Sequence, residues 1–272
     1  MLDQRPDWVL VYGDTNSTLA GALAAAKLSI PIAHVEAGLR SYNRTMPEEH
    51  NRVLTDHCST LLLCPTQTAV DNLQREGVTD GVHNVGDVMY DAALQFGERA
   101  LQHSQVLQLH ALLPKQYFLA TIHRAYNTDD PVRLSTLLRS FADLELPVVL
   151  PMHPRTRARL GGEVERLANV RVVDPLGYLD MLALEMNAAG ILTDSGGVQK
   201  EAFFFEVPCF SLRPETEWVE TVQAGWNVLV GHDAPNLKHA IASWARPAGS
   251  PPKPFGDGHA ADRIVALLAN PR

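Results

Sequence analysis

Short, continuously hydrophobic runs alternate with helix-like segments along most of the chain, and this pattern constrains the fold more than any other feature. The runs lack the polar–apolar alternation of a half-exposed strand, so we expect strands that are buried on both faces. Such strands form parallel sheets joined by crossover helices, which predicts the α/β class. The predicted strands are Trp8–Tyr12, Pro31–Val35, Leu61–Cys64, His83–Val85, Tyr117–Ile122, Val148–Pro151, Val170–Val173, Ile191–Thr193, Cys209–Leu212 and Val228–Val230.

The chain is expected to divide near residue 112. A long helical stretch, Asp91–Leu113, ends there, and a strong strand follows it at once. About four strands precede this point and about six follow, whereas a doubly wound domain usually has about six. We therefore predict a partial first domain over residues 1–112 and a complete second domain over 113–256. An exposed connection, Pro247–Phe255, precedes a last helix within residues 257–272, which we expect to pack back on the first domain.

Charge and composition narrow the classes of partner. The 272 residues are 46% hydrophobic and 20% charged, as in a globular protein. A net charge of −8 disfavours nucleic acid and anionic membranes as partners, because both attract clustered Lys and Arg. The apolar runs are too short to span a bilayer, and Met1–Asp7 lacks the layout of a signal peptide. Three separated cysteines indicate neither a zinc site nor disulfides, so we expect a cytoplasmic protein that acts on a small molecule.

The strongest local motif is T-D-S-G-G-V-Q-K-E at residues 193–201, where a predicted strand runs into a helix. Ser195 can cap that helix, while Gly196 and Gly197 let a ligand approach the free backbone N–H groups. The turn is therefore a candidate phosphate site, although an ordinary capped turn would look the same. Glu201, inside the helix, could hold a ribose diol or be a simple solvated residue.

Three acids stand at comparable places in the first half of the chain. Asp14 and Glu36 each follow a predicted strand, where ligands bind in open parallel sheets. Asp14 could also be a turn former, and Arg40 could pair with Glu36 as a structural ion pair. Glu48 lies in the first turn of a helix that starts at Pro47, where the helix dipole alone would explain an acid.

Basic residues and histidines gather at the strand ends of the second half. His123 closes the first strand there, and His153 and Arg155 close the next one. Each could contact a ligand or be structural. Arg213 belongs to the same half of the chain. Histidine spacing gives only weak support for a metal site, because no H-E-x-x-H motif occurs.

The sequence resembles the non-hydrolysing UDP-N-acetylglucosamine 2-epimerases over nearly its whole length. Seven motifs in order carry the resemblance: P-D-W-V-L-V-Y-G-D-T (6–15), H-V-E-A-G-L-R (34–40), P-E-E-H-N-R (47–52), H-R-A-Y-N (123–127), H-P-R-T (153–156), T-D-S-G-G-V-Q-K-E-A (193–202) and R-P-E-T-E-W-V-E (213–220). The resemblance implies two Rossmann-like domains in the GT-B architecture, with a UDP-sugar bound between them. It implies no cofactor and no metal, and a homodimer.

The resemblance also implies the reaction and the site. UDP-GlcNAc would be converted to UDP-ManNAc, a precursor of cell-surface polysaccharides, by elimination of UDP to a glycal intermediate. Asp14, Glu36 and Glu48 match the acids that transfer protons, and His123 matches a histidine at the substrate diphosphate. Residues matched to UDP binding are Ser195, Gly196, Gly197, Glu201, Met181, Arg213 and Trp218. Two or more carboxylates suit an inversion, because protons leave and arrive on opposite faces of the sugar.

Three departures from the family pattern leave alternatives. The family begins with a strand and a G-T-R-P-E type loop that are expected before residue 1. Tyr126 stands where the family usually has Glu, and Trp218 stands where many members have Arg. The latter change also occurs in epimerases of related UDP-diacetamido-uronic acids, which are an alternative substrate class. A catalytically silent UDP-sugar-binding fragment and a GT-B glycosyltransferase are further alternatives, whereas the lack of G-x-G-x-x-G disfavours an NAD enzyme.

Overall fold

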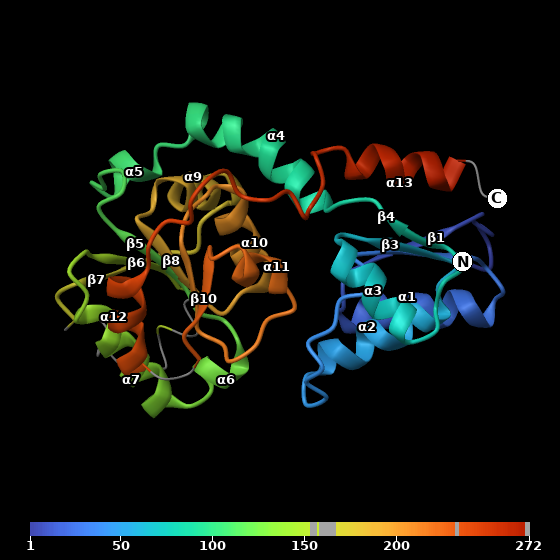
Figure 1. The fold of residues 1–272 in the computed structure, drawn as a ribbon, viewed down its shortest axis with the longest axis horizontal. Coiled ribbons are helices and arrows are strands. Elements are labelled where there is room, and N and C mark those ends of the chain that lie inside the picture. Colours follow the sequence, from blue (N-terminus) through green and yellow to red (C-terminus); the bar gives the residue numbers. More distant parts are fainter. Residues whose placement is uncertain (153–156, 158–166, 232–233, 270–272) are drawn as a thin grey trace. The chain divides into compact units, whose positions relative to one another are not determined.

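The computed structural model describes residues 1–152, 157, 167–231 and 234–269. Two parallel sheets with interleaved helices confirm the α/β prediction (Figure 1). The chain folds into two compact units, Met1–Ala92 with Lys253–Arg272, and Ala93–Pro252. The units divide inside a helix, earlier in the chain than the boundary expected at residue 112.

The first unit is built on a four-stranded sheet in the order β1-β2-β3-β4. Its strands are β1 (Val9–Tyr12), β2 (Ile32–Val35), β3 (Leu61–Cys64) and β4 (Val82–Asn84). Its helices are α1 (Asn16–Lys27), α2 (Pro47–Cys58), α3 (Gln67–Arg75) and α13 (Ala260–Ala269), together with the start of α4 (Val88–His103). All four predicted strands are confirmed, because each hydrophobic run is long enough for one buried strand and no longer.

The inner strands β2 and β3 are covered on both faces, whereas Leu10 and Tyr12 of the edge strand β1 are exposed. On one face, Val11 and Ile32 pack with Ala22 and Ala25 of α1. On the other, residues such as Val35 pack with Ile264 of α13. Asp91 at the start of α4 accepts hydrogen bonds from the first backbone N–H groups of α13, at 3.1 and 2.8 Å, and so anchors that helix.

The second unit contains a six-stranded parallel sheet in the order β7-β6-β5-β8-β9-β10. This is the doubly wound order. Successive strands are added first on one side of β5 and then, from β8 on, on its other side, so the strand order reverses between β5 and β8. The strands are β5 (Phe118–Thr121), β6 (Val148–Pro151), β7 (Val170–Val173), β8 (Gly190–Thr193), β9 (Cys209–Ser211) and β10 (Asn227–Leu229). These six predicted strands are also confirmed.

Adjacent residues of these strands belong to different cores. Phe118 and Ala120 face one core with α7 and α12, while Tyr117 and Leu119 face another with α9 and α10. Figure 1 shows these two helix pairs on opposite sides of the sheet. The helices are α5 (Val106–Leu109), α6 (Ala125–Thr128), α7 (Pro131–Ala142), α9 (Tyr178–Asn187), α10 (Gly196–Phe204), α11 (Val219–Gln223) and α12 (Ala234–Ser243).

One predicted helix is interrupted. The stretch Asp91–Leu113 forms α4 and α5, with a break at Ser104. The Ser104 hydroxyl donates to Asp180 on α9 (2.6 Å) and accepts from Val106 N (3.2 Å), which replaces helical hydrogen bonds locally. The partner lies far away in the sequence, so periodicity could not reveal the break.

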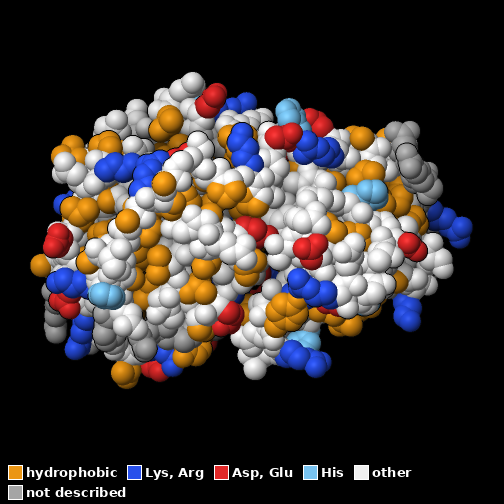
Figure 2. Space-filling view, in the orientation of Figure 1, with side chains coloured by type: hydrophobic (Ala, Val, Ile, Leu, Met, Phe, Trp, Pro, Cys, Tyr) orange, Lys and Arg blue, Asp and Glu red, His pale blue; other side chains and the backbone are white. Residues whose placement is uncertain are grey.

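The described helices include none that is long and apolar enough to cross a membrane. On the face drawn in Figure 2, Lys and Arg side chains lie interspersed with Asp and Glu.

Candidate functional site

Asp14 and Glu36 lie at one edge of the first sheet, because each follows a parallel strand. Gly13 lies between β1 and Asp14 with φ +62°, and a Cβ there would lie 3.3 Å from Oε2 of Glu36. The Glu36 carboxylate therefore lies directly against the turn that carries Asp14. A cavity of about 210 Å³ opens at this place; its lining includes Gly13, Glu36, Pro65 and the turn 86–89.

Glu36 has an uncommon backbone conformation. Its φ is +72°, a left-handed value that a glutamate rarely adopts and that costs on the order of 1–3 kcal/mol. The surrounding structure holds it there, since Glu36 N donates to Leu63 O at 3.1 Å. Strain at a partly exposed acid that lines a cavity favours a functional role for Glu36 over a structural one.

A network of buried side chains bonds to the turn at Gly13 and to the turn that follows Glu36 at Gly38. One ring nitrogen of His34 donates to Gly13 O (2.8 Å) and the other lies 2.7 Å from the carboxylate of Asp56. Asp56 also accepts from Gly38 N (3.1 Å) and from Arg40 (2.7 Å). Burial alone would raise the pKa of Asp56, but His34 and Arg40 hold it below its usual range. Arg40, considered above as a partner of Glu36, pairs with Asp56 and Glu76.

The helix α2 meets Asp14 directly. Asn51 donates to Asp14 O (2.9 Å), and the buried Arg52 guanidinium forms an ion pair with the Asp14 carboxylate. Glu48 lies four residues before Arg52, so both side chains belong to the same face of α2. Helix periodicity thus puts Glu48 on the face of α2 that carries Arg52, the partner of Asp14.

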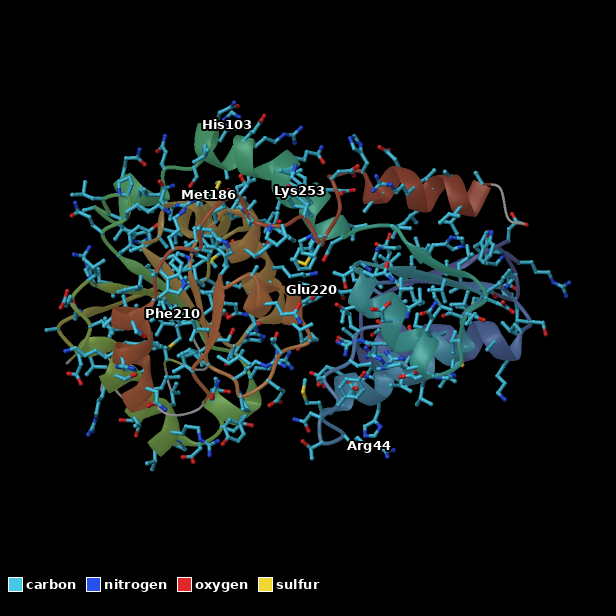
Figure 3. The ribbon with its side chains drawn as sticks, in the orientation of Figure 1. Arg44, His103, Met186, Phe210, Glu220 and Lys253 are labelled. Carbon is cyan, nitrogen blue, oxygen red and sulfur yellow. The ribbon has the colours of Figure 1, made fainter. Side chains whose placement is uncertain are left out.

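Glu49, next to Glu48, has a structural role. It is buried, and it accepts from Ser41 N (2.9 Å), Tyr42 N (3.0 Å) and Arg52 (3.3 Å). It also borders a larger cavity of about 350 Å³ beside the loop that carries Arg44 (Figure 3). The smaller cavity, rather than this one, is lined by a candidate acid, and we assign the site there.

In the second unit, the candidate residues follow β5 and β8, the two neighbouring strands at which the strand order of the sheet reverses. Ligands bind at this switch point in doubly wound sheets. Ser195 caps α10 as predicted, accepting from Val198 N at 3.4 Å. His123 follows β5, and its side chain is 58% exposed. The first backbone N–H groups of α10 and the His123 ring therefore belong to one sheet edge.

Asp194 joins these two segments. Its buried carboxylate lies 2.9 Å from Nδ1 of His123 and accepts from the backbone N–H groups of His123 (3.1 Å) and Arg124 (3.1 Å). Asn127 donates to it as well, at 2.9 Å. Burial alone would raise the pKa of Asp194, but the hydrogen bonds from His123 and Asn127 hold it below its usual range.

A buried cluster forms the wall beside the Ser195 turn. A Cβ on Gly196 would lie 3.0 Å from Oε1 of Glu217 and 3.2 Å from Nε1 of Trp218. Arg213 pairs with Glu217 at 2.8 Å. The ammonium of Lys200, which is fully buried, lies 4.0 Å from the centre of the Trp218 ring. The structure thus brings Arg213 and Trp218 to the predicted phosphate turn.

Glu201 and Met181 lie where α9 and α10 pack together. Glu201 is buried on α10, and its carboxylate, together with burial, raises the pKa of Tyr178 on α9. Complete burial and the charge of Glu201 raise the pKa of Glu185 well above its usual range. Met181 is half-buried among the hydrophobic residues of α9. No sequence signal pointed to Glu185.

Several functional candidates were not singled out from the sequence. His34, Arg52 and Asp194 all belong to quoted motifs, but their roles depend on contacts across the fold. His153 and Arg155 lie outside the described residues. Tyr126, which replaces the usual Glu, stacks under Arg133, whose guanidinium lies 3.7 Å from the ring centre. Among the residues that the structure describes, no group of three or more His, Cys, Asp or Glu could hold a metal ion.

The chain is similar to known proteins of one family. A family model described as UDP-N-acetylglucosamine 2-epimerase matches residues 1–269. The chain is 49% identical to a UDP-N-acetylglucosamine 2-epimerase homolog of Methanococcus maripaludis, over 99% of this chain and 77% of that protein. It is 50% identical to the UDP-2,3-diacetamido-2,3-dideoxy-D-glucuronate 2-epimerase of Pseudomonas aeruginosa, over 99% of this chain and 76% of that protein.

Solved structures show the same similarity. The structure of Methanocaldococcus jannaschii UDP-GlcNAc 2-epimerase in complex with UDP-GlcNAc and UDP matches with a TM-score of 0.92 and 43% identity, covering 98% of this chain and 77% of that one. The Neisseria meningitidis UDP-GlcNAc 2-epimerase bound to UDP-GlcNAc matches with a TM-score of 0.90 and 32% identity, covering 99% of this chain and 78% of that one.

Proposed function

Because the chain belongs to the UDP-N-acetylglucosamine 2-epimerase family, we propose that it is an isomerase that inverts carbon 2 of a UDP-sugar, converting UDP-GlcNAc to UDP-ManNAc for polysaccharide synthesis. One observation carries this proposal. Glu36 lines a cavity against the turn that carries Asp14, and Arg52, four residues after Glu48 on α2, pairs with Asp14. An epimerase needs several carboxylates at one place, and the left-handed backbone of Glu36 beside a cavity supports a functional role for that acid.

The chemistry requires two proton transfers at carbon 2. A carboxylate removes the proton from carbon 2, the C–H electrons form a double bond to carbon 1, and UDP leaves with the electrons of its bond to carbon 1. A glycal and free UDP result. A second acid then protonates carbon 2 from the opposite face while UDP re-forms its bond to carbon 1. General acid–base catalysis by positioned carboxylates suits both transfers.

We assign these transfers to Asp14, Glu36 and Glu48. Support comes from the contact between Glu36 and the Gly13 turn, and from the Arg52 ion pair that ties Asp14 to α2. Departing UDP needs donors for its new negative charge, and we assign His123 and the first N–H groups of α10 to that task. UDP binding is further assigned to Ser195, Gly196, Gly197, Glu201, Met181, Arg213 and Trp218.

Deuterium exchange tests the reaction. In deuterated water, the full chain should exchange the carbon 2 hydrogen of UDP-GlcNAc on the order of once per second or faster, as followed by NMR. This readout detects the first chemical step even when the epimer does not accumulate. Exchange that is absent in a chain that still binds UDP would support the UDP-sugar-binding alternative over an enzyme.

A glycine substitution tests the phosphate turn. Gly196→Val adds a branched side chain where a Cβ would already lie 3.0 Å from Glu217, and it covers the N–H groups that a phosphate would reach. UDP affinity in calorimetry should fall at least about tenfold. Gly177→Val is the matched control, because it also lies at a helix start in this unit but has open space around it. Equal affinities in both variants would place UDP elsewhere.

A diacetamido-uronic acid is the second candidate substrate. The 50% identity to the Pseudomonas aeruginosa enzyme favours it, and so does Trp218, which stands where many members of the family have Arg. Exchange rates measured side by side on UDP-GlcNAc and on the UDP-diacetamido-glucuronate would decide between them. Whichever sugar exchanges at least about tenfold faster at equal concentration is the substrate.

Assembly and location are proposed with the same family in view. A homodimer predicts a mass of about twice 29.9 kDa in light scattering. We place the protein in the cytoplasm, where UDP-sugars and reduced thiols occur together. The three cysteines are free in the structure, which agrees with a reducing compartment.

A further inference from the structure

We infer that Asp194 is a positioning residue, which holds the His123 ring so that its outer nitrogen donates to a phosphate oxygen of UDP. This inference rests on the proposed function, because it needs UDP at the α10 turn. Asp194 itself does not touch UDP in this role. It acts through His123. Because Asp194 directly precedes Ser195, its bond to His123 also links the histidine to the turn that binds the same diphosphate.

The contacts give Asp194 little freedom. Its side chain is fully buried, and its two oxygens accept from His123 and Arg124 backbone N–H groups and from the Asn127 amide at 2.9–3.1 Å. The remaining contact is to Nδ1 of His123, at 2.9 Å. The carboxylate is therefore fixed, while the histidine ring beyond it is mostly exposed. A rigid acceptor beneath an exposed ring sets the direction in which the other ring nitrogen points.

Hydrogen-bond chemistry then determines what His123 can do. An ionised carboxylate only accepts, so Nδ1 must carry the hydrogen that bonds to Asp194. In a neutral ring, Nε2 would then have a lone pair, which repels a phosphate oxygen. A phosphate at Nε2 therefore requires a ring with hydrogens on both nitrogens, and Asp194 supplies the opposite charge for it.

The same contacts occupy two backbone amides beside the His123 ring. The N–H groups of His123 and Arg124 both donate to Asp194, so neither is available to a phosphate. The N–H groups at the start of α10 are oriented for an anion by the helix. Diphosphate recognition is thus divided between the α10 turn and one ring that Asp194 orients.

A double-mutant cycle on ligand affinity tests this inference in the full chain. Asp194→Asn, His123→Ala and the double variant are titrated with UDP and with uridine by calorimetry. Each single change should weaken UDP binding by about tenfold, and the double variant should bind within about twofold of the weaker single variant. Uridine lacks phosphates, so its affinity should stay within about twofold of wild type in all three.

Asn127→Ala is the matched control. It removes another hydrogen bond to Asp194 but leaves the His123 contact, so UDP affinity should change less than about twofold. A second measurement needs no variant of Asp194: in histidine-labelled protein saturated with UDP, NMR should show hydrogens on both ring nitrogens of His123. A hydrogen on only one of them would overturn the inference.

Three further outcomes would also overturn it. Losses that multiply in the double variant would show that Asp194 acts independently of His123. A loss of uridine affinity equal to the loss of UDP affinity would show that Asp194 only supports the fold. Unchanged UDP affinity in His123→Ala would remove His123 from the diphosphate, whereas a failure of the wild-type chain to bind UDP would instead contradict the proposed function.

Discussion

Glu185 is a buried acid whose pKa depends on Glu201 of α10, the helix that we assign to UDP binding. It is 1% exposed on α9, and its negative neighbour is Glu201 on α10. Two carboxylates this close cannot easily both be charged in a buried place. The folded protein therefore keeps Glu185 protonated to a higher pH than an exposed glutamate.

We predict that Glu185→Gln stabilises the second unit at neutral pH. The pKa of Glu185 is raised in the folded state, so the folded protein holds a proton that the unfolded chain loses above its ordinary pKa of 4.5. Stability therefore falls as pH rises above 4.5, by at most about 1.4 kcal/mol per pH unit. Glutamine removes this dependence. Denaturant unfolding between pH 5 and 8 should show converging stabilities at pH 5 and a gain for the variant at pH 8.

The three candidate acids are predicted to act on rate rather than on affinity. Asp14→Asn, Glu36→Gln and Glu48→Gln should each lower turnover by about 10²-fold or more, as the loss of a general acid or base does. UDP affinity should change little, because UDP is assigned to the second unit. Steady-state kinetics and calorimetry measure the two effects separately. Near-normal turnover in Glu48→Gln would leave the helix dipole as the reason for that acid.

At the scale of an element, the turn after β2 depends on one glycine. Gly38 has φ +80°, and a Cβ there would lie 2.4 Å from the carbonyl oxygen of Ala69 on α3. Its amide donates to Asp56 and its carbonyl accepts from Asn72 at 3.0 Å, so the backbone cannot move away without losing both bonds. This close packing of backbone on α3 positions the strained Glu36 two residues earlier.

Gly38→Ala should therefore destabilise the first unit by at least about 2 kcal/mol, because it adds a steric clash to backbone strain. Gly77→Ala is the matched control: its φ is +77°, and a Cβ there would meet nothing within 4 Å. The control should lose only about 1–2 kcal/mol, the cost of the left-handed conformation. Denaturant unfolding measures both, and equal losses would show that the contact with Ala69 is unimportant.

The elements could be predicted from the sequence to different degrees. All of the predicted strands occur, because a strand buried on both faces needs a continuous hydrophobic run and such runs are visible in the sequence. The break at Ser104 was not predicted from the helical pattern; the Ser104 hydroxyl donates there to Asp180 on another helix. Arg40 was considered as a partner of Glu36, but it pairs with Asp56 and Glu76. Both lie far from Arg40 in the sequence, so sequence proximity did not indicate them.

The candidate site was partly predictable as well. Asp14 and Glu36 in the first sheet, and His123 and Ser195 in the second, could be placed because the parallel strands of each sheet end at the same edge of that sheet. Their orienting partners could not, because neither the ring contact between His123 and Asp194 nor the ion pair between Asp14 and Arg52 leaves a periodic signal. The spacing of residues shows where a side chain lies along an element, and only the fold shows what it faces.

At the scale of the whole molecule, each unit has hydrophobic cores of its own. Those of the second unit lie on both faces of the six-stranded sheet, and those of the first unit lie on both faces of the smaller sheet. A unit with its own core can unfold as a unit. The residues that we assign to UDP all belong to the second unit, which leads to the last prediction.

We predict that UDP shifts one of two thermal transitions. Binding to the folded second unit alone stabilises that unit by about 2.7 kcal/mol when UDP is present at 100 times its Kd. Calorimetry should then show the transition of the second unit moving to higher temperature while that of the first unit stays, because no assigned UDP residue lies there. At the same UDP concentration, Gly196→Val should lose about half of this stabilisation or more, because a tenfold weaker affinity leaves UDP at about 10 times its Kd, and Gly177→Val should retain it. A UDP-dependent shift of both transitions together would show that the ligand also contacts the first unit or that the two units unfold as one.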